Sequence, residues 1–181
     1  MIDPAYWEVQ RFFFAYPSRT PSLTQLAEEL SMHKGTASRA VRRLEDEGFL
    51  AVEVLGRIWR ITCNDHAYHR TRKVAYHLSL ILDSGIIERI RAAHPMGAII
   101  LYGSVRKGDD VESSDIDLAI ESNDDRIGSF GTIDLGYRTS VPVNLRFFSR
   151  KRIDPYLFSN IGNGIVLDGF LEVYAGQKAG S

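Results

Sequence analysis

The chain has 181 residues, of which 44% are hydrophobic and 25% are charged, and its formal net charge at pH 7 is −1. These values are typical of a globular protein with one large or two small domains. No apolar run approaches the length of a bilayer span, and the first residues lack the basic and apolar parts of a signal peptide, so we expect no membrane partner. The single cysteine, Cys63, excludes an internal disulfide and a Cys-rich zinc site, and we therefore expect a cytoplasmic protein.

The first 64 residues predict a small helical domain that ends in a β-hairpin. Apolar residues recur at helical spacing in residues 4–15, 23–30 and 34–47. Residues 50–55 and 57–62 are rich in β-formers and meet at a glycine, which indicates a hairpin.

The third of these helices carries a basic surface opposite its apolar stripe. Arg and Lys neutralise phosphates or read guanine, and Ser and Thr donate to phosphate oxygens. The residues that we expect to contact nucleic acid, on this helix and on the hairpin, are Lys34, Thr36, Ser38, Arg39, Arg42, Arg43, Arg57 and Arg60.

The order of helix, helix, turn, helix and hairpin resembles that of a winged helix-turn-helix, and residues 26–50 resemble bacterial and archaeal winged-helix transcription regulators. The resemblance implies double-stranded DNA as a partner. A role of this module in binding RNA or another protein is the alternative.

Residues 65–83 predict a further helix, with an apolar side and a basic side that carries Arg70, Arg72 and Lys73. Helices of this kind often mediate dimerisation, and a two-fold axis would match a palindromic operator. We therefore expect a homodimer.

Two carboxylates follow a glycine-serine turn in the second half of the chain. An apolar strand, 98–102, ends at Gly103-Ser104, and a second strand carries Asp115 and Asp117 at its start. Side chains two apart on a strand leave the same face, so the two carboxylates point the same way. Such a pair of oxygen ligands suits Mg²⁺ or Mn²⁺ and could hold a nucleoside triphosphate through the metal.

The turn itself has the features of a phosphate site. Gly103 and Ser104 let backbone amides approach phosphate oxygens, and Arg106 and Lys107 add positive charge beside them. The alternative for Arg106 and Lys107 is that they are ordinary loop charges.

This part of the chain resembles the signature of the DNA polymerase β superfamily, and most closely its minimal nucleotidyltransferases. The resemblance rests on Gly-Ser followed, after ten intervening residues, by Asp115-Ile-Asp117. The alternative is an unrelated acidic turn between two strands. The resemblance implies an α+β chain whose C-terminal half has a small mixed sheet with helices on one face. The division that we expect is a winged helix-turn-helix at 1–64, a linker or dimerisation helix at 65–83 and a nucleotidyltransferase-like domain at 84–176.

A third carboxylate usually completes the metal site in members of this superfamily that transfer nucleotides. Here the equivalent position, in the alternating segment 141–149, is Asn144, which brings no negative charge and cannot take a proton. Asp134, in the weakly amphipathic segment 126–140, is a candidate replacement; the alternative for it is an acid on the surface of a helix.

Two functions follow from these residues. The first is a magnesium-dependent nucleotidyltransferase that moves a nucleoside monophosphate from a triphosphate to a hydroxyl and is coupled to a DNA-binding domain. Some minimal nucleotidyltransferases modify a partner toxin, so the resemblance makes a protein acceptor plausible. The second is a transcriptional regulator whose nucleotidyltransferase domain has lost its chemistry and senses a nucleotide or dimerises.

Overall fold

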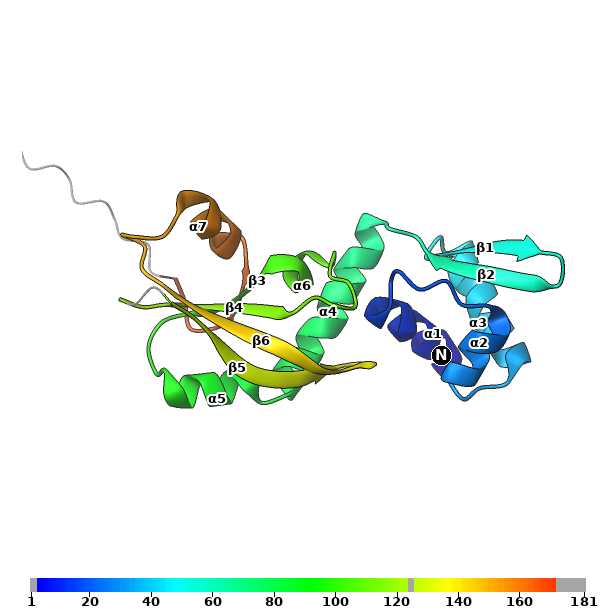
Figure 1. The fold of residues 1–181 in the computed structure, drawn as a ribbon, viewed down its shortest axis with the longest axis horizontal. Coiled ribbons are helices and arrows are strands. Elements are labelled where there is room, and N and C mark those ends of the chain that lie inside the picture. The colour runs from blue at the N-terminus through cyan, green and yellow to red at the C-terminus, as the bar shows by residue number, and fades with distance from the viewer. Residues whose placement is uncertain (1–2, 124–125, 172–181) are drawn as a thin grey trace, which may run out of the picture.

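The computed structural model describes residues 3–123 and 126–171 of the chain. The N-terminal half contains α1 (Pro4–Ala15), α2 (Leu23–Glu29), α3 (Lys34–Asp46), β1 (Leu50–Leu55) and β2 (Ile58–Cys63) (Figure 1). The long helix α4 (Ala67–Asp83) crosses to the other half. That half contains α5 (Ile86–Ala93), β3 (Ile99–Tyr102), α6 (Gly103–Lys107), β4 (Ile116–Glu121), β5 (Arg126–Leu135), β6 (Arg138–Phe148), α7 (Pro155–Gly162) and β7 (Ile165–Asp168).

Local capping signals set the ends of the N-terminal helices. The Ser22 side chain accepts a hydrogen bond from the Gln25 amide at 3.3 Å, and the Gln25 side chain accepts one from the Ser22 amide at 2.9 Å, which together form a capping box. Beyond α3, Gly48 adopts a left-handed conformation with φ of +74° that favours glycine. β1 and β2 pair antiparallel as the predicted wing.

The second half is built on a mixed five-stranded sheet with the order β5-β6-β4-β3-β7, in which only β4 and β6 run parallel. The expected helices α4 and α5 cover one face, where Ile81 and Ile90 pack against Leu118. The short helix α7 lies on the other face, where Ile161 packs against Phe148 (Figure 1). The α+β class, the winged helix and the mixed sheet are thus as predicted.

Segment 126–140 is not helical. It forms β5 and the turn into β6, and Gly136 occupies that turn with φ of +67°. Glycines and weak amphipathicity concealed this strand, because most of its pairing partner, β6, lies beyond the segment. Asp134 is therefore an exposed strand residue, and it accepts a hydrogen bond from the Ser140 amide at 2.9 Å.

α4 also differs from its predicted character, because its basic side is not wholly exposed. Lys73 is only 5% exposed. Its ammonium donates to the Asp110 carbonyl at 2.5 Å and lies 3.1 Å from the Asp110 carboxylate. Arg138, at the start of β6, lies 2.9 Å from the same carboxylate. A buried ionic cluster thus joins α4, the loop before β4 and the β5–β6 hairpin.

Further contacts connect the two halves. The Tyr16 hydroxyl donates to the Tyr137 carbonyl at 2.8 Å, and the Tyr137 hydroxyl donates to Glu8. Glu112, in the loop before β4, accepts hydrogen bonds from the Ser18 amide at 3.1 Å and from its hydroxyl at 2.8 Å. Among the described residues, no helix combines the length and apolar character that crossing a bilayer requires.

His77 of α4 gives the fold a specific pH dependence. Burial, together with the charges of Lys73 and Arg138, lowers the pKa of His77 to about 2. The unfolded chain takes up a proton near the usual pKa of about 6.5, whereas folded His77 does not, so its contribution to stability is present above that pH and is lost as the pH falls. Between pH 6 and pH 5 the wild type should lose about 1 kcal/mol more unfolding free energy than His77→Leu. Urea denaturation at both pH values measures this difference, and equal losses would contradict it.

Candidate functional site

The predicted carboxylates lie together at the start of β4. Asp115 immediately precedes the strand, and Asp117 pairs in register with Tyr102 of β3 on one side and with Asn144 of β6 on the other. The side chains of Ile116 and Leu118 are fully buried, and both belong to the core on the helix-covered face. Strand alternation therefore sends both carboxylates to the opposite face.

Asn144 occupies the position between the carboxylates. Its side-chain amide donates to Asp115 at 3.2 Å and to Asp117 at 3.4 Å. The structure therefore places the Asn144 side chain beside both carboxylates, on the strand next to β4. An amide in this place neutralises part of the mutual repulsion of the carboxylates, but it cannot remove a proton from an acceptor hydroxyl.

Gly103 is required by close packing as well as by its backbone conformation. Its φ is +76°, and a Cβ built on it would overlap the Asp117 carboxylate and would lie 3.2 Å from the Asp117 Cγ. The turn between β3 and α6 thus lies directly against one of the two predicted metal ligands. Ser104 follows in the first turn of α6, and its backbone carbonyl accepts a hydrogen bond from Gly108 at 2.9 Å.

Arg146 belongs to this face of the sheet, although sequence reasoning did not assign it to the site. It is two residues beyond Asn144 on β6, and its charge offsets part of the rise in pKa that burial causes at Asp117 and Tyr102. For both groups burial is the larger influence and raises the pKa. Strand alternation puts Arg146 and Asn144 on the same face of β6, and this pattern in the sequence could have identified Arg146 as a residue of the site.

The two basic residues of α6 differ in their surroundings. Arg106 is half-buried, and its Nε has no hydrogen-bond partner within the described part of the chain. Lys107 is exposed. Both lie in the last turn of α6, one turn beyond Gly103 and Ser104. Arg106 is thus the better placed of the two to gain a partner from a ligand.

The donor set suits a hard cation that brings its own additional ligands. Asp115 and Asp117 offer carboxylate oxygens, and the described residues contain no group of three or more His, Cys, Asp or Glu side chains that could hold a metal. Asp134 does not complete the set, because its carboxylate is engaged at the β5–β6 turn. A magnesium ion held here would need phosphate oxygens or water to complete its shell.

The basic residues of the winged helix separate into two groups. Arg42 lies 2.6 Å from Glu45 and stacks on Trp59 of the wing, Arg43 lies 3.3 Å from Glu47, and Arg60 lies 3.6 Å from Glu53. By contrast, Lys34, Arg39 and Arg57 are exposed and have no acidic partner among the described residues. Thr36 and Ser38 are half-buried beside them. The second group therefore offers the uncompensated charge on α3 and the wing.

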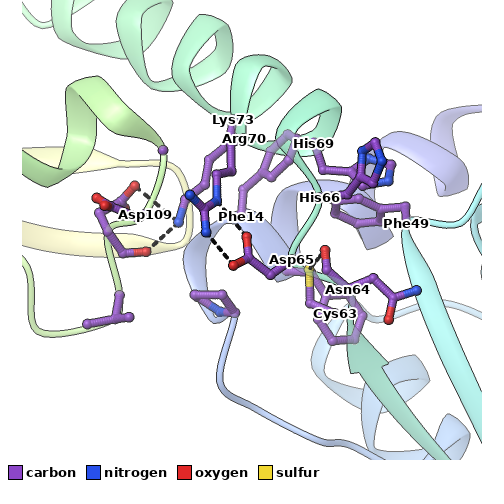
Figure 2. Close-up of a pocket in the computed structure, with 15 residues that line it drawn as sticks. Phe14, Phe49, Cys63, Asn64, Asp65, His66, His69, Arg70, Lys73 and Asp109 are labelled. Carbon is purple, nitrogen blue, oxygen red and sulfur yellow. Dashed lines mark hydrogen bonds and ion pairs between the residues drawn. The ribbon is translucent and has the colours of Figure 1, made fainter.

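A cavity of about 200 Å³ lies where the two halves meet, between α1, the start of α4 and loop 108–111. Figure 2 shows the aromatic rings of Phe14 and Phe49 on its walls and Lys73 pointing toward the loop, while Arg70 pairs with Asp65. The His69 ring is buried against Phe49, with ring centroids 4.7 Å apart. Loop 108–111 directly follows α6, so this cavity borders both halves of the molecule.

Comparison with known protein families agrees with this geometry. Residues 15–53 match the model of the MarR family, and residues 84–161 match the model of the nucleotidyltransferase domain. The chain is a winged helix fused to a nucleotidyltransferase domain. No curated protein matches it. The nucleotidyltransferase match includes β3, α6, β4 and β6, which carry the Gly-Ser turn, the paired carboxylates and Asn144.

Replacement of Gly103 by Ala should weaken nucleotide binding, because the added Cβ displaces the Asp117 carboxylate. We expect Mn²⁺–ATP affinity to fall at least tenfold, measured by electron paramagnetic resonance of the bound ion. Gly128→Ala is the matched control, since a Cβ there meets nothing within 4 Å. Equal affinities of the two variants would show that the Gly103–Asp117 contact does not shape the site.

Proposed function

We propose that the chain is a DNA-binding protein whose nucleotidyltransferase domain binds a magnesium–nucleoside triphosphate and reports its presence to the winged helix. Asp115 and Asp117 would hold the metal, and the turn at Gly103 and Ser104, together with Arg106, would hold the phosphates. Magnesium supplies charge neutralisation and a template for the triphosphate.

The position of Asn144 carries this proposal. It donates to both carboxylates where an acid would be needed to complete a two-metal site, and Asp134 lies elsewhere. Loss of one anion weakens the site most for an ion that relies on protein ligands alone. An ion that also coordinates the triphosphate loses less of its binding affinity. Binding of the metal–triphosphate is therefore expected to persist where nucleotide transfer is lost.

A route for communication with DNA also supports the proposal. The loop that links the Gly-Ser turn to Asp115 contacts the N-terminal half through Glu112 with Ser18, and it contacts the connecting helix α4 through Asp110 with Lys73. A triphosphate that orders both ends of this loop would therefore bias its contacts with the residues just before α2.

Transfer of a nucleoside monophosphate to a hydroxyl, including one on a protein acceptor, is the second candidate. The observation that favours it is that the Gly-Ser turn and the paired carboxylates both lie within the segment that matches the nucleotidyltransferase domain. In this case Asn144 would act only by orienting the carboxylates, and the base would come from solvent or from the acceptor.

Calorimetry with each of the four nucleoside triphosphates should distinguish these functions when it is combined with a transfer assay. We expect at least one Mg²⁺–triphosphate to bind the wild type, and Asp115→Ala with Asp117→Ala to abolish binding. We expect no label from an α-labelled triphosphate to reach protein or RNA in extract with the wild type, and measurable transfer with Asn144→Asp, which restores the third carboxylate.

Two results would change this conclusion. Label transfer by the wild type that the double Asp variant loses would establish the transferase. Absence of triphosphate binding to the wild type and to Asn144→Asp alike would refute both candidates.

The winged helix supports binding of double-stranded DNA through the uncompensated residues Lys34, Arg39 and Arg57, with a homodimer as the form that would meet two half-sites. Arg42, Arg43 and Arg60 would contribute after release from their acidic neighbours, and Thr36 and Ser38 would donate to phosphates.

Lys34→Ala combined with Arg39→Ala should weaken duplex binding at least tenfold. The slope of log K against log salt should fall by about 2, since two phosphate contacts are lost. Fluorescence anisotropy with a labelled duplex between 50 and 200 mM salt measures both quantities. The matched control is Arg89→Ala with Lys151→Ala, two exposed charges of the other half. Equal slopes for the two double variants would place the DNA elsewhere.

A further inference from the structure

A second cavity lies in the groove between α1 and α4, on the N-terminal half. Its volume is about 290 Å³, near the lower end of the range of about 300–1,000 Å³ that small-molecule sites span. The residues that line it are Trp7, Gln10, Arg11, Phe14, Arg72, Ala75 and Tyr76. None of them belongs to the carboxylate site or to the DNA-binding face.

Gln10 is the unusual member of this lining. Its side chain is 0% exposed, and neither its amide oxygen nor its amide nitrogen has a hydrogen-bond partner among the described residues. A buried amide left without partners destabilises a fold, and nearly all such groups in proteins are paired. An amide that offers one acceptor and one donor side by side is complementary to the edge of a nucleobase, in the same way that Gln reads adenine in DNA.

The other lining residues supply the remaining chemistry of such a ligand. Trp7 and Tyr76 present aromatic rings from α1 and α4, and rings of this kind stack on nucleobases. Arg72 lies 5.3 Å from the Trp7 ring centroid, and Arg11 lies 5.4 Å from the Tyr76 centroid. Both guanidinium groups line the same cavity as the rings and lie beside them, so either can turn toward the phosphate of a nucleotide whose base takes its place on the ring.

From this arrangement we propose that the α1–α4 groove is a binding site for a purine mononucleotide, separate from the metal–triphosphate site. Gln10 recognises the base edge, Trp7 and Tyr76 hold the base plane, and Arg11 and Arg72 bind the phosphate. The size of the cavity fits one mononucleotide rather than a longer strand.

Existing contacts of the two arginines do not prevent this binding. Arg11 lies 3.2 Å from Glu8, and its side chain is 42% exposed. Arg72 lies 3.9 Å from Glu47, and its guanidinium donates a hydrogen bond of 3.2 Å to the Tyr6 hydroxyl. Ion pairs this exposed or this long contribute little stability, so a bidentate phosphate can replace them.

Tryptophan fluorescence provides a direct test. The chain contains two tryptophans, Trp7 and Trp59, so Trp59→Phe leaves Trp7 as the only reporter. The titration uses AMP and GMP in EDTA, on a background that also carries Asp115→Ala and Asp117→Ala, so that the metal-dependent site is silent. We expect saturable quenching by at least one of the two nucleotides and at least tenfold weaker binding of ribose 5-phosphate and of adenosine or guanosine.

Two substitutions test the residues of the groove. Gln10→Leu should weaken nucleotide binding at least tenfold while the melting temperature of the free chain stays constant or rises, because an unpaired buried amide is removed. Ala75→Phe fills the cavity from an exposed position and should abolish quenching without disturbing the core.

The proposal is overturned if neither nucleotide quenches Trp7, or if Ala75→Phe binds as tightly as its parent. Ribose 5-phosphate that binds as tightly as AMP or GMP would also overturn it, since that result describes an anion site alone. These outcomes leave the proposed triphosphate site untouched, because every titration is made without metal and without its two carboxylates.

Discussion

The candidate nucleotide site depends on a carboxylate that lies outside it. Asp110 lies in the loop between the Gly-Ser turn and Asp115, and its side chain is fully buried between the ammonium of Lys73 and the guanidinium of Arg138. Two cations of this kind are tolerated in a core only when an anion compensates them, and the anion is tolerated only because of them. The loop between the Gly-Ser turn and Asp115 is therefore held in place by residues of α4 and of the β5–β6 hairpin, outside the signature.

The charge of the site sets what it can bind. Two carboxylates, one amide and a nearby arginine leave it less negative than a site with three carboxylates, and less able to concentrate free metal ions. A metal ion that arrives with a triphosphate needs fewer protein ligands. Arg146 and Asn144 alternate on one strand, so the same β6 segment supplies both the loss of an anion and the gain of a cation beside Asp117.

Local sequence patterns predicted much of this molecule. Caps, periodicity and glycines located α1 to α3, the wing and the strands around the Gly-Ser turn, and the alternation of residues 141–149 predicted the strand that carries Asn144, which the structure pairs with Asp117. The failures involve partners outside the local pattern. β5 was hidden because its stability comes from pairing with β6. The burial of Lys73, which the sequence placed on the basic side of its helix, was not expected, because periodicity cannot reveal that Asp110, 37 residues later, compensates its charge. The unpaired amide of Gln10 left no sequence signal. A helix that buries three phenylalanines in succession gives no indication that one polar residue beside them is buried as well.

The course of α4 has a consequence for the folding of the two halves. Tyr76 packs with the aromatic core of the winged helix, and Ile81, little more than a turn later, belongs to the core of the sheet. A cut before this helix would remove Tyr76 from the winged-helix core, and a cut after it would remove Ile81 from the core of the sheet. One helix therefore contributes to both interiors, and the fusion is not a tether between two modules that share no packing.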